Sequence, residues 1–148
     1  MVPKDIATYH LQLFKFYLSV LDLRTLCAGH PFAALDATEE VIITAFTHLV
    51  LRLAETAFKP MFLKLLEWGT RAEAATVRQL VLYRVVDALA GSLKSLFVPY
   101  FSNLLKTSIA ILDGTAAVVQ DATLGGVVRP LVVSVLHKCF LFDDQVCV

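Results

Sequence analysis

The side chains that could carry out chemistry are few and lie far apart. They are the histidines and cysteines His10, His30, His48, His137, Cys27, Cys139 and Cys147. Two metal ligands on one helix are usually three or four residues apart, so that both face the ion. His10 and His48 have no such neighbour, and His137 and Cys139 are two residues apart, on different faces of a helix. We therefore predict no metal site.

The acidic residues and glycines also lack a catalytic pattern. Glu39-Glu40 and Asp143-Asp144 are adjacent pairs that flank predicted helices, where carboxylates complement the helix dipole or face solvent. No serine stands in a G-x-S-x-G turn, and no glycine-rich loop with a following lysine could hold a phosphate. We read Gly125-Gly126 as a turn. The sequence predicts a protein that is not an enzyme, with no cofactor and no small-molecule substrate.

Aromatic and basic residues in the middle of the chain leave one recognition function open. Residues 52–106 carry eight Lys/Arg and four Asp/Glu, although the whole chain has a net charge of zero. The candidate contacts to RNA or a protein partner are Lys59, Lys64, Arg71 and Arg78. Nearby aromatic residues could stack on bases, but their spacing favours packing in a helical core. They are Phe58, Phe62, Trp68, Tyr83, Phe97, Tyr100 and Phe101.

The composition indicates more apolar surface than one small domain can bury. Of 148 residues, 57% are hydrophobic and 18% are charged, against about 45–50% and about 25% in typical domains. The longest runs without Asp, Glu, Lys or Arg are 11 residues, too short to cross a bilayer, and the N-terminus lacks the layout of a secretory signal. We expect no membrane association, and we expect a partner or a longer chain to cover the excess apolar surface.

Three unclustered cysteines fit a reducing compartment, with Cys27 and Cys139 buried.

The apolar periodicity is helical almost throughout. Gly-His-Pro should end the first helix, and Asp36 lies three residues before Glu39, the spacing of a capping box for the second, with Thr38 as a rival cap. A connector of about 12 residues should precede the last helix. The six predicted helices cover about 4–27, 36–53, 57–69, 72–90, 93–112 (with a restart near Pro99) and a last one that starts between 127 and 130 and reaches about 142.

Pro60 lies within the apolar stretch FKPMFLKLLEWGT, residues 58–70. Proline lacks a backbone N–H and is tolerated in the first turn of a helix, where that group has no intrahelical partner. With Thr56 or Ala57 as the cap, Pro60 falls in this turn, and a sharp corner between two helices follows near Glu55. We expect Trp68 to be buried, so that Trp68→Ala costs about 3–5 kcal/mol of stability.

The predicted fold is all-α, a single domain at residues 1–148. Six helices pair as hairpins of about 30–40 residues, the size of HEAT and armadillo repeats, which stack into an α-solenoid. A closed six-helix bundle fits the pattern nearly as well, so that both architectures stay open on periodicity alone.

Three blocks resemble a known family: residues 51–69 (LRLAETAFKPMFLKLLEWG), 93–105 (LKSLFVPYFSNLL) and 136–145 (LHKCFLFDDQ). The most specific pattern is Phe-basic-Pro-apolar-Phe with tryptophan six residues later. The resemblance is to the Utp-ten, or HEAT repeat-containing protein one, family and covers about residues 42–145. The positions that match the motif are Phe58, Pro60, Phe62, Leu65 and Trp68, which the resemblance implies are architectural.

The resemblance implies a segment of a HEAT-type α-solenoid in a non-enzymatic nucleolar scaffold. The scaffold would belong to the small-subunit processome and support pre-18S rRNA processing, small-subunit assembly and rDNA transcription. The implied partners are other processome proteins of the early-binding subcomplex, and pre-rRNA through the basic middle. Members of the family continue beyond the position of Val148, so this sequence is expected to be part of a longer solenoid protein. The alternatives are a helical bundle that binds an apolar ligand and an unrelated HEAT-repeat transport adaptor.

Overall fold

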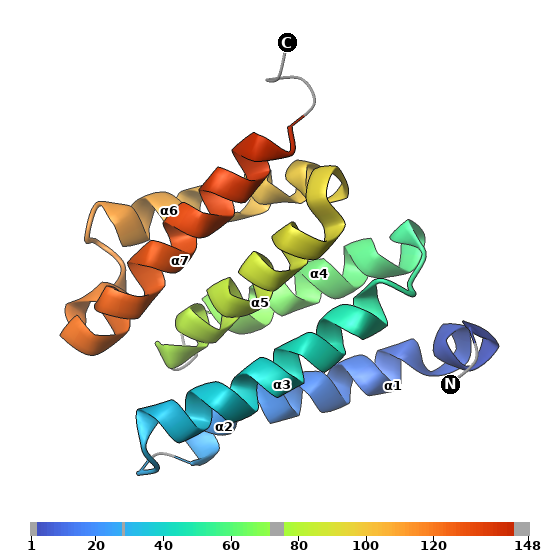
Figure 1. Cartoon of the computed structure of the whole chain (residues 1–148), viewed down its shortest axis with the longest axis horizontal. Coiled ribbons are helices and arrows are strands. Elements are labelled where there is room, and N and C mark those ends of the chain that lie inside the picture. The colour runs from blue at the N-terminus through green and yellow to red at the C-terminus, as the bar shows by residue number, and fades with distance from the viewer. Residues whose placement is uncertain (1–2, 28, 72–75, 144–148) are drawn as a thin grey trace. The chain divides into compact units, whose positions relative to one another are not determined.

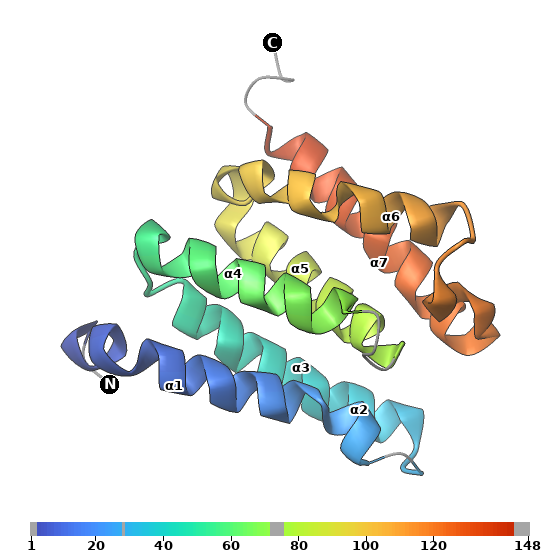
Figure 2. The same cartoon turned by 180° about the vertical axis from the view of Figure 1, so that it is seen from behind.

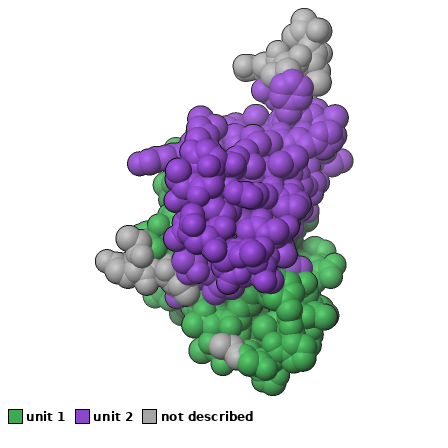
Figure 3. Space-filling view, turned by 90° about the vertical axis from the view of Figure 1, so that its left-hand side faces the viewer, with its two compact units in different colours: residues 1–73 green, residues 74–148 purple. Residues whose placement is uncertain are grey.

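The computed structural model describes residues 3–27, 29–71 and 76–143. Every regular element in these residues is helical, which confirms the all-α prediction. The chain divides into two compact units, Met1–Glu73 and Ala74–Val148, which Figure 3 shows in two colours.

Unit 1 contains α1 (Pro3–Leu21), the single turn α2 (Leu23–Leu26), α3 (Phe32–Val50) and α4 (Glu55–Thr70). Helices α1 and α3 run antiparallel, side by side in both views (Figures 1 and 2). Aromatic rings close their interface: the centroid of Phe46 lies 6.2 Å from that of Phe14 and 5.4 Å from that of Tyr17. Phe14 and Phe46 are each 1% exposed, so this cluster forms the core of the first hairpin.

Two predicted helix boundaries in unit 1 were wrong. The first predicted helix is divided at Asp22 into α1 and α2. The second begins at Phe32, four residues before Asp36, and no side chain caps its N-terminus. Asp36 and Glu39 are therefore inside α3 and do not form a capping box. The predicted stop between the two helices is confirmed. Gly29 lies in it with a φ of 139°, a backbone conformation that favours glycine. Ala28 lies outside the described residues.

Pro60 also occupies a different position from the one predicted. The corner before α4 is present, but the helix is capped at Ala54 and begins at Glu55. Pro60 is therefore the sixth residue of α4, beyond the first turn, where its missing N–H leaves the carbonyl of Thr56 without the usual helical donor. Sequence reasoning failed because it used proline as a marker of helix starts, and α4 tolerates the proline on its exposed face.

Unit 2 contains α5 (Val77–Leu93), α6 (Leu105–Leu112) and α7 (Ala122–Leu141), joined by short 3₁₀ helices at Lys94–Leu96, Val98–Leu104 and Ala117–Gln120. Helix α5 packs against α7 and is buried over most of its circumference. Helices α6 and α7 contact each other and run in opposite directions (Figures 1 and 2). The hydroxyls of Tyr83 and Ser108, both buried, lie 2.7 Å apart and join α5 to α6.

The last helix begins earlier than predicted. Asp121 caps α7, because its carboxylate accepts hydrogen bonds from the backbone N–H groups of Thr123 and Leu124. The predicted connector is thus largely helical, and the predicted Gly125-Gly126 turn lies inside α7. Glycine at position 125 avoids a tight contact, since a Cβ there would stand 3.2 Å from the Cα atom of Val119. Glycine at this contact lets the two backbones approach, which the sequence pattern could not reveal.

Two further helix ends lie close to the predictions. Helix α4 ends one residue after the predicted Gly69, and α6 ends at Leu112, before the predicted stop at Asp113 and Gly114. Gly114 has a φ of 85°, the left-handed conformation that commonly ends a helix. The predicted start of the fourth helix near Ala72 falls outside the described residues, and α5 is described from Val77. The predicted fifth helix is mainly 3₁₀ before Leu105.

Candidate interaction surfaces

The titratable side chains do not assemble a reactive centre in the part of the chain that the structure describes. No group of three or more His, Cys, Asp or Glu side chains there could hold a metal ion. Cys139 is buried, and burial raises the pKa of its thiol to about 11, so it is protonated and unreactive near neutral pH. Cys27 is only half-buried, contrary to prediction. Cys147 lies outside the described residues.

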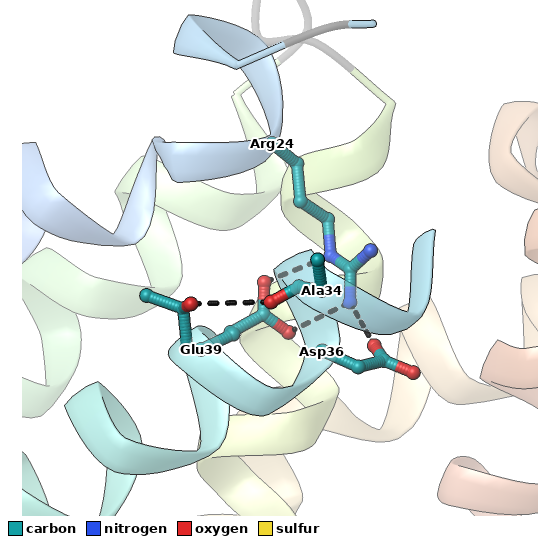
Figure 4. Close-up of polar contacts among 5 residues, drawn as sticks. Arg24, Ala34, Asp36 and Glu39 are labelled. Carbon is teal, nitrogen blue, oxygen red and sulfur yellow. Dashed lines mark hydrogen bonds and ion pairs between the residues drawn. The ribbon is translucent and has the colours of Figure 1, made fainter. Parts of the chain in front are cut away.

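A buried ion cluster holds α2 against α3 (Figure 4). The Arg24 guanidinium donates from Nε to Glu39 at 2.8 Å and from Nη2 to the second Glu39 oxygen at 3.2 Å, and it also pairs with Asp36. Its carbon Cζ stands 4.4 Å from the centre of the Phe32 ring. Arg24 is 6% exposed and Glu39 0%. Glu39, predicted to be a cap or solvated, is instead the buried anion that compensates Arg24.

The electrostatics of this cluster favour the charged form of Arg24. Burial alone would lower the pKa of Arg24, but the hydrogen bonds and charges of Glu39 and Asp36 outweigh it, and the pKa is raised. Sequence reasoning missed the cluster because it assigned Asp36 and Glu39 to a helix start. The available signal was that Asp36 and Glu39 are three residues apart and share one helix face. Arg24 is the only lysine or arginine between Lys15 and Arg52.

The five motif residues on α4 have different surroundings. Phe58, Phe62 and Leu65 are buried, at 6%, 1% and 1% exposed. Pro60 is exposed, and Trp68 is only partly buried. Because the premise of a fully buried indole is wrong, Trp68→Ala should cost less than emptying a fully buried site. The role of this motif in shaping a corner between repeats remains a prediction.

The aromatic residues offer little to a nucleic acid. Five of the seven that could have formed a stacking platform are buried, at 0% to 8% exposed, and they are Phe58, Phe62, Tyr83, Phe97 and Tyr100. Trp68 and Phe101 are partly exposed. A buried ring cannot stack on a base, so the surroundings of these side chains favour the packing interpretation.

The four candidate basic contacts are divided between the units. Lys59 and Lys64 are exposed on α4, and Lys59 lines a shallow depression together with Pro60 and Leu63. Arg71, at the end of α4, pairs with Glu67 at 2.7 Å. Arg78 lies on α5 in unit 2 and is partly buried. Three of the four thus belong to unit 1, and no contact with RNA is established for any of them.

An apolar surface lies on one side of the α6–α7 pair. Its members, here called the α6/α7 surface, are Leu105, Ile109, Leu112, Val133 and Phe140, which are exposed by 48%, 54%, 42%, 55% and 68%. Each of the five directly follows a buried residue in the sequence. The buried residues are Leu104, Ser108, Ile111, Val132 and Cys139. One residue turns a helix by 100°, so each apolar stripe stands beside the buried stripe of its helix. Since the helices contact each other and run in opposite directions, the same rotation brings both stripes to the same side.

The opposite flank of α7 is tied to α5 by polar contacts. Asp87 accepts hydrogen bonds from Ser134 at 2.6 Å and from Lys138 at 2.9 Å.

By length and composition, α7 is also the one described helix that could cross a membrane, with 20 residues and a mean hydropathy of 1.5. The prediction from sequence counted only stretches without Asp, Glu, Lys or Arg. It did not identify α7 as a candidate span because Arg129 and Lys138 interrupt its apolar sequence. Core helices of soluble proteins satisfy the same criterion, and the predicted lack of membrane association stays a prediction.

Comparisons with known proteins link the sequence to large repeat proteins. The BP28CT (NUC211) domain family matches residues 5–148. Relatives named HEAT repeat-containing protein 1 in Macaca fascicularis and Homo sapiens are each 28% identical over 158 residues, which cover 98% of this chain but 16% and 7% of the relatives. U3 small nucleolar RNA-associated protein 10 of Chaetomium globosum is 29% identical over 156 residues, covering 97% of this chain and 9% of the relative. The chain thus spans less than a fifth of these relatives, and no solved structure is significantly similar to it.

Proposed function

Because the chain belongs to the BP28CT (NUC211) domain family, we propose that it is a non-catalytic helical scaffold segment of the small-subunit processome. The observation that carries this proposal is the match over nearly the whole chain to relatives named HEAT repeat-containing protein 1 and U3 small nucleolar RNA-associated protein 10. Those names describe a repeat architecture and an association with a nucleolar RNA. The proposed location is accordingly the nucleolus.

The physical properties of the chain support a structural role. The described side chains form no catalytic or metal-binding group, whereas several large apolar side chains are exposed on helix faces. Helical repeats bind partners along such faces and hold them in fixed positions without chemistry. In the proposed function, the segment positions early processome proteins during pre-18S rRNA processing and small-subunit assembly, and thereby supports rDNA transcription.

RNA contact is the finer part of this proposal. Lys59 and Lys64 are exposed on α4 and have no ion-pair partner among the described residues, so they are available to phosphate groups. A net charge of zero is low for a nucleic-acid reader. Protein contacts are therefore proposed to dominate, with pre-rRNA touched at this basic part of α4.

A crosslinking experiment in cells tests the proposal. The longer protein that contains this segment is tagged and crosslinked, and its bound RNA and proteins are identified. Recovery of U3 RNA, the 5′ external spacer of pre-rRNA and processome proteins is expected. Lys59→Glu with Lys64→Glu should reduce RNA crosslinks within residues 55–71 while protein recovery persists. Recovery of transport factors without U3 or pre-rRNA would instead favour the transport-adaptor alternative.

A further inference from the structure

The α6/α7 surface has the size of the apolar patches that often mark partner sites. Its five side chains together expose an apolar area on the order of 500 Å², at the upper end of what a monomeric protein usually leaves in one patch. The exposed residues are spaced by four and three along α6 and by seven along α7, so they form two short ridges. A pair of apolar ridges is the form of surface that accepts an amphipathic helix.

The size of the surface argues against a second copy of the chain. A standard protein–protein interface buries about 800 Å² on each partner, and the α6/α7 surface offers less. It does suit one helix: the eight residues of α6 are about 12 Å long, so about two turns of a partner helix would span them. The occupant is thus expected to be a single helix.

The charges beside the surface indicate the chemistry of that helix. Lys106 is exposed three residues before Ile109, and Arg129 is anchored to α6 by its contact from Nε to the carbonyl oxygen of Ile111 at 3.5 Å. Neither cation has a carboxylate partner among the described residues. The one carboxylate at this end of α6, Asp113, accepts hydrogen bonds from the backbone N–H and hydroxyl of Thr115. Around α6, two cations thus stand against one carboxylate, an excess of one positive charge, while Asp143 lies one turn beyond Phe140 at the far end of the surface.

We propose that the α6/α7 surface is a docking site for an amphipathic helix of another protein, whose apolar stripe is flanked by carboxylates. The apolar stripe would cover Ile109, Val133 and Phe140, and the flanking carboxylates would pair with Lys106 and Arg129. This inference deepens the proposed scaffold role by giving one of its partner sites a chemical specificity.

Binding of two designed peptides to the purified chain tests the proposal. Both are amphipathic helices with the same leucine stripe; one carries glutamates beside the stripe and the other carries lysines. Fluorescence anisotropy of the labelled peptides measures the dissociation constants at low and high salt. We expect the glutamate peptide to bind at least about tenfold more tightly than the lysine peptide, with the difference reduced by salt.

Three variants connect this binding to the surface. Phe140→Asp should weaken binding of the glutamate peptide at least about tenfold, and Arg129→Glu should abolish the preference for glutamate over lysine. Leu26→Asp is the matched control, because Leu26 is 74% exposed and lies in unit 1. It should change neither property. Circular dichroism checks that each variant remains folded.

Several results would overturn the proposal. They are equal affinities for the two peptides, no detectable binding, and binding that Phe140→Asp leaves unchanged. A dimer in sedimentation experiments that Phe140→Asp dissociates would assign the surface to a second copy instead. These measurements use purified chain and peptides, so they are independent of whether U3 RNA is recovered from cells.

Discussion

Removing Glu39 should destabilise unit 1 far more than removing a carboxylate from an exposed ion pair of equal length. Glu39 and Arg24 are almost completely buried and 2.8 Å apart. Glu67 and Arg71 are 2.7 Å apart, with side chains 64% and 55% exposed. The shortest N···O distances are nearly the same, so the difference between the two mutants reflects burial and the second hydrogen bond from Arg24 to Glu39 rather than distance.

The structure sets the expected magnitudes. Breaking a buried pair leaves an uncompensated charge and costs about 3–5 kcal/mol. Arg24 keeps its contact with the half-exposed Asp36, so the loss for Glu39→Gln should fall near the lower limit, about 3 kcal/mol. Glu67→Gln should cost less than about 1 kcal/mol, because solvent screens that pair.

A double-mutant cycle separates the pair from the rest of the cluster. Arg24→Met alone should also be strongly destabilising, whereas Arg24→Met with Glu39→Leu removes both buried charges and should recover most of the stability. Urea unfolding measures each variant by circular dichroism and by fluorescence of Trp68, the only tryptophan, which reports on unit 1. A loss below about 1 kcal/mol for Glu39→Gln would refute the reasoning, because a buried Arg24 left with only the half-exposed Asp36 should cost more than that.

Four further predictions concern backbone and titration effects. Gly125→Ala should destabilise by about 1–3 kcal/mol, because the new Cβ meets backbone at 3.2 Å; its control Gly126→Ala, which faces open space, should stabilise by up to about 1 kcal/mol in urea unfolding. Lys94→Gly should raise the urea midpoint, since Lys94 has a φ of 54°, a conformation that costs a side-chain-bearing residue about 1–3 kcal/mol. Pro60→Ala should also raise it, because alanine restores the backbone donor in the second turn of α4; a lower midpoint would show that packing needs the proline. Burial raises the pKa of Tyr83 to about 12, from the value of about 10 that is usual for tyrosine. The folded chain therefore holds this proton when the unfolded chain has lost it, so stability should fall as pH rises from about 10 to 12, and Tyr83→Phe should flatten that fall in unfolding curves measured across the range.

The all-α fold and most of the core could be predicted from the sequence, because both depend on the spacing of apolar residues. Phe14, Phe46, Phe62 and Leu65 occupy core positions at helical spacing and are buried. This signal is redundant, since many residues report the same period, and an error at one position does not change the assignment.

Helix boundaries were less predictable, because each depends on one or two residues with more than one possible role. Asp36 and Glu39 have the spacing of a capping box and also the spacing needed to reach a buried arginine, and the structure uses the second. Gly125 has the sequence signature of a turn, but it permits a close contact between α7 and the backbone of Val119. Only tertiary contacts distinguish these alternatives, and a single sequence does not contain them.

The candidate surfaces depend on a distinction that periodicity alone does not make. On α6 and α7, each residue of the α6/α7 surface directly follows a buried residue, so the sequence shows one broad apolar stripe per helix. The buried half of that stripe packs inside unit 2, with α5 as a principal contact, and the exposed half forms the α6/α7 surface. The high hydrophobic content of the chain thus has two physical origins, a core that stabilises each unit and a surface whose exposure is costly unless a partner covers it. Polar substitution distinguishes them: Val132→Asp should unfold unit 2, whereas Val133→Asp should leave it folded and impair only association.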